Sequence, residues 1–236
     1  MCQTLGWHRL RDTGDETTQK QASTFWFCYT LDKSLSLRFG RSSIFQDWDI
    51  TTPRRFTSAT DPLQGSLDTW AESSRIQGDM YEHLYSPAAL SRAAEQRVET
   101  AQLLVTRLTQ LRQQMQSFSE ALKREKRAMV EACVPDVRDK EWRMMNLEMA
   151  LKAGEVGHWT ALTLVYRAIP SASTTGSPPE CVEAARTAFR CHEECMNLTS
   201  ISLFAKIGYL HWYILLLYCC YNTKFLPLLF TTIQTD

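Results

Sequence analysis

Residues 25–49 read FWFCYTLDKSLSLRFGRSSIFQDWD, and this stretch decides most of what the sequence says about its fold. From Gln21 onward, apolar and aromatic residues recur every three or four positions, which is the spacing of one buried helix face. Gly40 can adopt the left-handed conformation that ends a helix without a Cβ clash. A polar stretch then leads to the acidic and aromatic corner at residues 47–50, DWDI. We therefore expect a buried helix, a glycine stop and a rigid polar loop.

Charged residues lie among the aromatic ones in this stretch. They are Asp32, Arg38, Arg41, Asp47 and Asp49. Buried charges need partners, and the fork of an arginine guanidinium matches a carboxylate. We expect Arg38 or Arg41 to pair with one of the three aspartates and to hold the loop against the helix. If that pair is buried, substituting Arg41 should cost about 3–5 kcal/mol of folding stability.

The overall composition is that of a globular protein. Of 236 residues, 44% are hydrophobic and 22% are charged, which supplies a core and argues against intrinsic disorder. Lysine and arginine together number 26, and so do aspartate and glutamate. A domain that grips nucleic-acid phosphates is usually basic, so this balance argues against DNA binding by this segment itself.

The remaining sequence favours helices joined by polar segments. Residues 12–20 are polar and loop-like, and the prolines at 53 and 62 bracket an extended connector that ends near Leu67. Ser86-Pro87 should cap a long helix that runs without glycine or proline to Val134. Further helices are expected at residues 139–168 and 180–198, with a flexible loop at 171–179 between them. The fold class is therefore all-α.

Along the long helix, apolar residues alternate at spacings of four and three. They are Leu104, Leu108, Leu111, Met115, Phe118 and Leu122. The favoured interpretation is a helix packed within its own domain, and the alternative is the seam of a coiled-coil dimer. The basic run at residues 123–127 is interpreted as a solvated helix face, with nuclear import or partner contact as the alternative.

Residues 201–221 form the most apolar window of the chain, ISLFAKIGYLHWYILLLYCCY. The window is long enough to span a bilayer of about 30 Å. Lys206 and His211 would raise the cost of insertion, and flanking basic residues that would set an orientation are missing. A helix buried in the domain is therefore favoured over a membrane anchor, which stays as the rival interpretation.

Candidate chemistry is sparse. The eight cysteines contain no C-x2-C pair and, without a signal peptide, indicate reduced, mostly buried thiols of an intracellular protein. Cys191 and Cys195 lie one helical turn apart, but a structural zinc site needs four ligands, so core cysteines are favoured there. His158 has no nucleophile at a recognisable spacing, and glycine-rich phosphate loops and hydrolase motifs are absent. We therefore expect no enzyme, no metal and no cofactor site in this chain.

Several phrases occur in a characteristic order. They are LGWHRL at 5–10, LDKSLSLRFGRSS at 31–43 with DWDI after it, GDMYEHLYSPAAL at 78–90, TLVYRAIP at 163–170 and HW at 211–212. Together they resemble the fungal-specific transcription factor domain, the middle homology region that accompanies binuclear zinc-cluster DNA-binding modules. Within that pattern, Asp32, Arg38, Gly40, Arg41, Asp47 and Asp49 would be structural motif residues. The whole of residues 1–236 would be one such domain, partial at both ends.

The resemblance also implies a role and a set of partners. The family would make this chain the regulatory domain of a nuclear transcription regulator of RNA polymerase II genes. The implied partners are a second copy of the chain, a co-regulator or a small-molecule effector. DNA would be reached only through a zinc-cluster module, whose six cysteines are missing from this sequence, so zinc is implied for that module alone.

Overall fold

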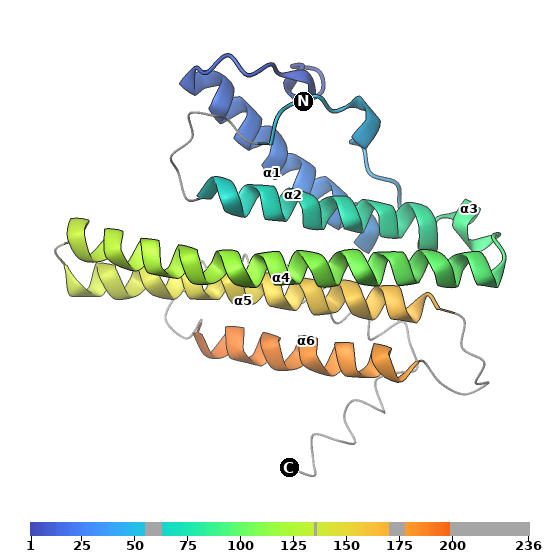
Figure 1. Cartoon of the computed structure of the whole chain (residues 1–236). Helices are drawn as coiled ribbons and strands as arrows, with labels where there is room; N and C mark the ends of the chain where they lie inside the picture. The colour runs from blue at the N-terminus through green and yellow to red at the C-terminus, as the bar shows by residue number, and fades with distance from the viewer. Residues whose placement is uncertain (55–62, 135, 170–177, 199–236) are drawn as a thin grey trace, which may run out of the picture. The chain divides into compact units, whose positions relative to one another are not determined.

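The computed structural model describes residues 1–54, 63–134, 136–169 and 178–198, and every regular element in these ranges is a helix (Figure 1). This confirms the predicted all-α class. The chain divides into two compact units, Met1–Met115 and Gln116–Asp236.

The first unit is built around a pair of helices. Its elements are η1 (Trp7–Arg9), α1 (Glu16–Arg38), η2 (Asp47–Asp49), α2 (Leu63–Met80), η3 (Tyr81–Tyr85), α3 (Pro87–Leu90) and the first part of α4 (Ala94–Cys133). Helices α1 and α2 lie side by side (Figure 1). Helix α2 occupies a region where the sequence pattern predicted only the end of a connector. Residues 55–62 of that connector lie outside the described residues.

Helix α1 begins before Gln21, where the apolar pattern starts. The Asp15 carboxylate accepts a hydrogen bond from the backbone N–H of Thr18 at 2.9 Å and so caps the helix. Glu16 and Lys20 then form an ion pair one turn apart, at 2.6 Å. The loop predicted for residues 12–20 is therefore wrong after Asp15, because a good cap lets a polar segment start a helix that is buried only from its second turn.

The end of helix α1 confirms the predicted glycine stop. Gly40 has a φ of 62°, in the left-handed region. Its backbone N–H donates to the Leu37 carbonyl at 3.3 Å, and the N–H of Arg41 donates to the Ser36 carbonyl at 3.0 Å. These two bonds satisfy carbonyl groups that the helix end leaves open. The chain thus reverses sharply and returns along α1.

The long helix predicted from Ala88 to Val134 is interrupted near its start. Ser86 caps a short helix α3 as expected, since its Oγ accepts a hydrogen bond from the N–H of Ala89 at 3.1 Å. Helix α3 ends at Leu90, and the Ser91 hydroxyl donates to the Ala88 carbonyl at 2.8 Å. Such side-chain bonds compete with the helix ladder without needing glycine or proline. Helix α4 restarts at Ala94 and continues for 40 residues.

The leucines of the predicted seam are buried within the chain. Leu104, Leu108 and Leu111 in the first unit and Leu122 in the second are each between 1% and 5% exposed. A coiled-coil dimer would need this seam to be open to a partner chain. The burial of these four leucines supports the interpretation of a helix packed within its own chain, and the coiled-coil alternative stays a prediction.

In the second unit, helices α5 (Val137–Arg167) and α6 (Pro179–Leu198) lie side by side (Figure 1). Asp136 caps α5 by accepting from the N–H of Asp139 at 3.0 Å. Both helices confirm the predicted ones to within a few residues. The flexible loop predicted at 171–179 falls mostly outside the described residues, and Pro179 already belongs to α6. The apolar window at 201–221 lies outside them entirely.

Candidate functional site

The motif loop, residues 43–50, is seated on a cluster of aromatic rings. Phe25, Trp26 and Tyr29 project from consecutive turns of α1, and all three are buried. Phe45 of the motif loop meets the Phe25 ring edge-on, with 5.3 Å between ring centroids. Edge-to-face contacts of this kind add to the apolar burial of large rings. The aromatic run in the sequence thus becomes the platform that holds the loop.

Asp32 ties the start of the motif loop to helix α1. Its Oδ2 atom accepts hydrogen bonds from the backbone N–H groups of Ile44 and Phe45, at 2.8 and 3.0 Å. A carboxylate that accepts from two backbone donors forms charge-assisted bonds, which are stronger than neutral ones. Asp32 therefore acts on the loop backbone, and not on an arginine as we expected.

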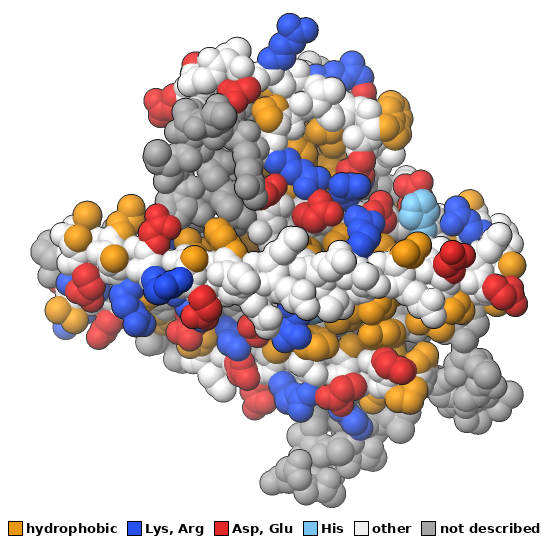
Figure 2. Space-filling view, viewed as in Figure 1, with side chains coloured by type: hydrophobic (Ala, Val, Ile, Leu, Met, Phe, Trp, Pro, Cys, Tyr) orange, Lys and Arg blue, Asp and Glu red, His pale blue; other side chains and the backbone are white. Residues whose placement is uncertain are grey.

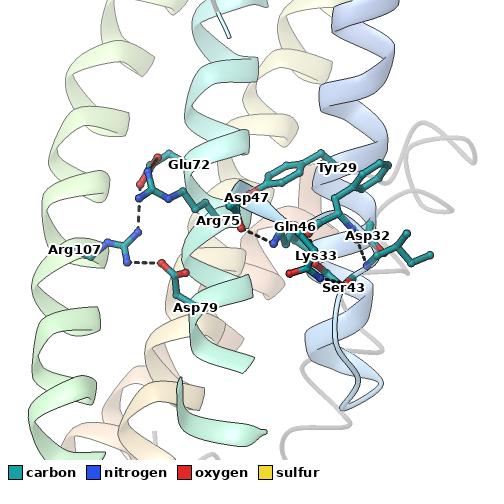
Figure 3. A network of polar contacts seen from close by, with 12 residues as sticks. Tyr29, Asp32, Lys33, Ser43, Gln46, Asp47, Glu72, Arg75, Asp79 and Arg107 are labelled. Carbon is teal, nitrogen blue, oxygen red and sulfur yellow. Dashed lines mark hydrogen bonds and ion pairs between the residues drawn. The ribbon is translucent and has the colours of Figure 1, made fainter. Parts of the chain in front are cut away.

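Asp47 joins the motif loop to two side chains of α1. It accepts a hydrogen bond from the Tyr29 hydroxyl and forms an ion pair with Lys33 Nζ at 2.6 Å (Figure 3). The Lys33 side chain is only 5% exposed, and its ammonium also lies 5.3 Å from the centre of the Tyr29 ring. Burial, the hydrogen bond to Asp47 and the negative charge of Asp47 together raise the pKa of the Tyr29 hydroxyl, which keeps it protonated as a donor.

The burial of Lys33 depends on a glycine of the neighbouring helix. A Cβ atom at Gly78 of α2 would lie 2.9 Å from Lys33 Cδ and 3.1 Å from its Nζ. A side chain at this point would force the Lys33 side chain to shift from its observed position. Gly78 therefore links the packing of α1 on α2 to the ion pair that holds the loop.

Asp49 joins the motif loop to the N-terminal segment. It forms an ion pair with Arg9, and its Oδ2 atom lies 3.5 Å from His8 Nε2; both residues belong to η1. The His8 carbonyl accepts hydrogen bonds from the N–H groups of Thr51 and Thr52, at 2.9 and 3.2 Å. Two phrases that are separate in the sequence, LGWHRL and DWDI, thus form one structural element.

The hypothesis that Arg38 or Arg41 pairs with these aspartates is therefore wrong about the cation. Lys33 and Arg9 hold Asp47 and Asp49, and Asp32 bonds to backbone. Arg41 is exposed, and its guanidinium lies 5.8 Å from the centre of the Phe39 ring. One signal could have identified Lys33: it follows Tyr29 by one helical turn and so shares its buried face.

A second polar cluster lies between α2 and α4, next to the first (Figure 3). Glu72 of α2 pairs with Arg54 at 2.8 Å, with Arg75 at 3.7 Å and with Arg107 of α4 at 3.5 Å. Arg107 also pairs with Asp79 at 2.5 Å. Burial opposes ionisation of Glu72, but the hydrogen bond from Arg54 and the three positive charges outweigh it, so the pKa of Glu72 is lowered. The sequence analysis did not single out any of these residues.

The polar residues of the second unit form ion pairs and a small core. Lys152 pairs with Glu155 at 3.2 Å and with Glu194 at 2.7 Å, which joins α5 to α6.

The Cys191 thiol packs in the core near Glu155. Burial together with the negative charge of Glu155 raises the pKa of this thiol, which disfavours the thiolate that binds metal. No group of three metal-binding side chains occurs among the described residues. His158 is buried, with its ring edge-on to Trp159.

The described surface mixes both signs of charge. On the face shown in Figure 2, acidic and basic side chains are interspersed, in keeping with the balanced composition. Lys123 of the basic run pairs with Glu120 at 3.4 Å, which agrees with a solvated helix face.

Within the part of the chain that the structure describes, no helix is both long and apolar enough to cross a membrane.

Comparison with known proteins agrees with the motif phrases that lie between residues 5 and 90, while the phrases at 163–170 and 211–212 fall outside the matched region. The sequence model of a family described as "Fungal specific transcription factor domain" matches residues 1–131. Two uncharacterized transcriptional regulatory proteins of Schizosaccharomyces pombe are similar to parts of the chain. One is 30% identical over 114 residues, which cover 42% of this chain and 15% of the relative. The other is 44% identical over 52 residues, which cover 21% of this chain and 8% of the relative.

The chain therefore spans only a small part of the length of these curated relatives. No solved structure matches it. The family match includes the whole motif loop, the helix pair α1–α2 and the Glu72 cluster, so the residues described above lie inside the matched region.

Proposed function

The chain belongs to the fungal specific transcription factor domain family, and from this premise we propose that it is the regulatory part of a fungal transcription regulator. In this role it changes the output of RNA polymerase II promoters through a bound effector or a partner protein. The observation that carries the proposal is the family match over residues 1–131, together with relatives whose names describe transcriptional regulation.

DNA contact is proposed to come from a separate zinc-cluster module and not from this segment. The equal numbers of acidic and basic residues support this division, because a phosphate-binding surface is usually basic. Zinc is then a cofactor of that module alone. A nuclear location follows from the same role. The motif residues Asp32, Gly40, Asp47 and Asp49 are proposed to serve the fold of the regulatory unit rather than chemistry.

The family is one of transcription factor domains and not a class of enzymes. We propose that this chain has no catalytic activity. The buried positions of His158 and Cys191 support this, since neither side chain is presented to a substrate at the surface.

A reporter experiment tests the regulatory role. The chain is placed between a heterologous DNA-binding module and an activation domain in yeast, and an inert Gly/Ser linker of equal length serves as the reference. We expect the chain to change reporter output relative to the linker. Equal outputs from the chain and the linker would reject the proposal.

Two phenylalanines of α1 provide a matched pair of variants for this reporter. Phe25 is fully buried, so Phe25→Ala should destabilise the first unit by about 3–5 kcal/mol and remove the effect. Phe27 is 53% exposed, so Phe27→Ala should retain it. The amount of each fusion protein is measured by immunoblot, so that loss of regulation is separated from loss of protein.

A further inference from the structure

Arg54, Arg75 and Arg107 form a three-arginine cluster around Glu72. Figure 3 shows Arg75 and Arg107 of this cluster beside Glu72. We propose that this cluster binds a small oxyanion, that is, a carboxylate or phosphate group of a metabolite-sized effector. The proposal deepens the proposed function and rests on it, because it assigns the effector of the regulatory unit a chemical class and a site.

The charges of the cluster are unequal. Three guanidinium groups face two carboxylates, those of Glu72 and Asp79, so the cluster carries one net positive charge. The lowered pKa of Glu72 keeps its carboxylate ionised at neutral pH, which makes this count valid under physiological conditions. An added anion would neutralise the remaining charge.

The hydrogen-bond donors of the cluster also exceed its acceptors. Each guanidinium has five N–H donors, and each carboxylate accepts about four bonds. Arg54 makes one hydrogen bond to Glu72, and Arg107 makes one to each of the two carboxylates. Arg75 reaches Glu72 only at 3.7 Å, which is an ion pair without a hydrogen bond. Donors therefore stay available, most of all on Arg75.

The cluster is accessible and only partly screened by water. The exposed fractions of the side chains are 29% for Arg54, 47% for Arg75 and 33% for Arg107. A ligand can reach these groups from solvent, yet their partial burial strengthens charge–charge attraction relative to a fully exposed surface. Guanidinium groups are also less strongly hydrated than ammonium groups and bind planar oxyanions with paired bonds.

Arg54 is held in place before any ligand binds. Its guanidinium lies 5.4 Å from the centre of the Trp26 ring, and the indole N–H of Trp26 donates to the Pro53 carbonyl at 3.0 Å. Preorganisation of this kind lowers the entropic cost of binding. Arg54 lies a few residues after the end of the motif loop, and Arg107 belongs to α4. A bound anion would therefore join these two parts of the chain through α2.

Binding is tested on the purified chain of residues 1–236. Titration calorimetry and thermal unfolding are measured with sodium citrate and with sodium phosphate, each against sodium chloride at equal ionic strength. We expect at least one of the two anions to bind and to raise the melting temperature above the chloride reference. The anion that binds identifies the group, and binding of neither would overturn the proposal.

Two arginine variants localise the site. Arg75→Ala should weaken binding about tenfold, the loss expected for one charge-assisted contact. Arg92→Ala serves as the control, because Arg92 is exposed and lies outside the cluster. If both variants weakened anion binding equally, the binding would reflect the overall charge of the chain, and the proposed site would be rejected. Regulation in the reporter without anion binding would reject the site alone, whereas binding without regulation would reject the proposed function.

Discussion

The ion pair between Lys33 and Asp47 should respond very differently to loss of one partner or the other. Asp47→Asn leaves the Lys33 ammonium without its carboxylate in a position where the side chain is 5% exposed. Removing one partner of a buried pair costs about 3–5 kcal/mol. Because Asp47 itself is 40% exposed and water screens the pair, we expect a smaller cost, about 2–4 kcal/mol.

Lys33→Met should cost less, about 1–2 kcal/mol, because the variant keeps the apolar stem against Gly78 and removes the buried charge. Asp47 would still accept the Tyr29 hydroxyl and contact water. The double variant should therefore be more stable than Asp47→Asn alone. The coupling energy between the Asp47→Asn and Lys33→Met substitutions should be about 1–3 kcal/mol, the range found for contacting residues.

Urea unfolding followed by tryptophan fluorescence measures the free energies, and hydrogen exchange at residues 43–50 assigns the change to the motif loop. Lys20→Met is the matched control, because Lys20 lies on the same helix with a side chain that is 74% exposed. It should change the free energy of unfolding by no more than about 0.5 kcal/mol, the contribution of its exposed ion pair with Glu16. If Asp47→Asn cost no more than Lys33→Met, or if the two changes were additive, the account of the loop given above would be wrong.

Three further changes follow from the same geometry. Arg41→Ala should change stability by less than about 0.5 kcal/mol in urea unfolding, since Arg41 is exposed; a loss of several kcal/mol would restore the original pairing hypothesis. Gly78→Ala should destabilise the first unit by about 1–3 kcal/mol through overpacking against Lys33, and the loss should vanish in a Lys33→Ala background. The lowered pKa of Glu72 contributes stability that is present above its ordinary value of 4.5 and is lost as pH falls through the folded-state value. Glu72→Gln should remove this part of the pH dependence, as melting curves between neutral and acidic pH would show.

Local features of the fold were predictable from the sequence because they depend on near neighbours. The aromatic spacing of α1 follows from the helix period, and the stop at Gly40 follows from a positive φ angle that glycine adopts without strain. The serine cap at Ser86 is likewise local. The break before Ala94 was missed, because it contains neither glycine nor proline and the competing serine hydroxyl leaves no strong signal.

The partners of the buried charges were not predictable, because each partner comes from a segment that is distant in the sequence. Lys33 is held by a motif loop that follows its helix and is given room by Gly78 of α2. The sequence indicates that Asp47 needs a cation, but an arginine next to the loop is as good a candidate as a lysine within the helix until the helices are packed.

The motif phrases therefore correspond to a set of contacts in the folded chain and not to one continuous segment of the sequence. LGWHRL, LDKSLSLRFG and DWDI are separated along the chain, yet Arg9 meets Asp49, and Lys33 meets Asp47 on either side of Trp48. Trp48 itself is 83% exposed, so the two aspartates are fixed while the residue between them faces solvent. A loop held at both flanks by ion pairs stays ordered without burying its tip. Such a construction explains why acidic and aromatic residues alternate in this corner, since the acids anchor the backbone and leave the aromatic side chain outside the core.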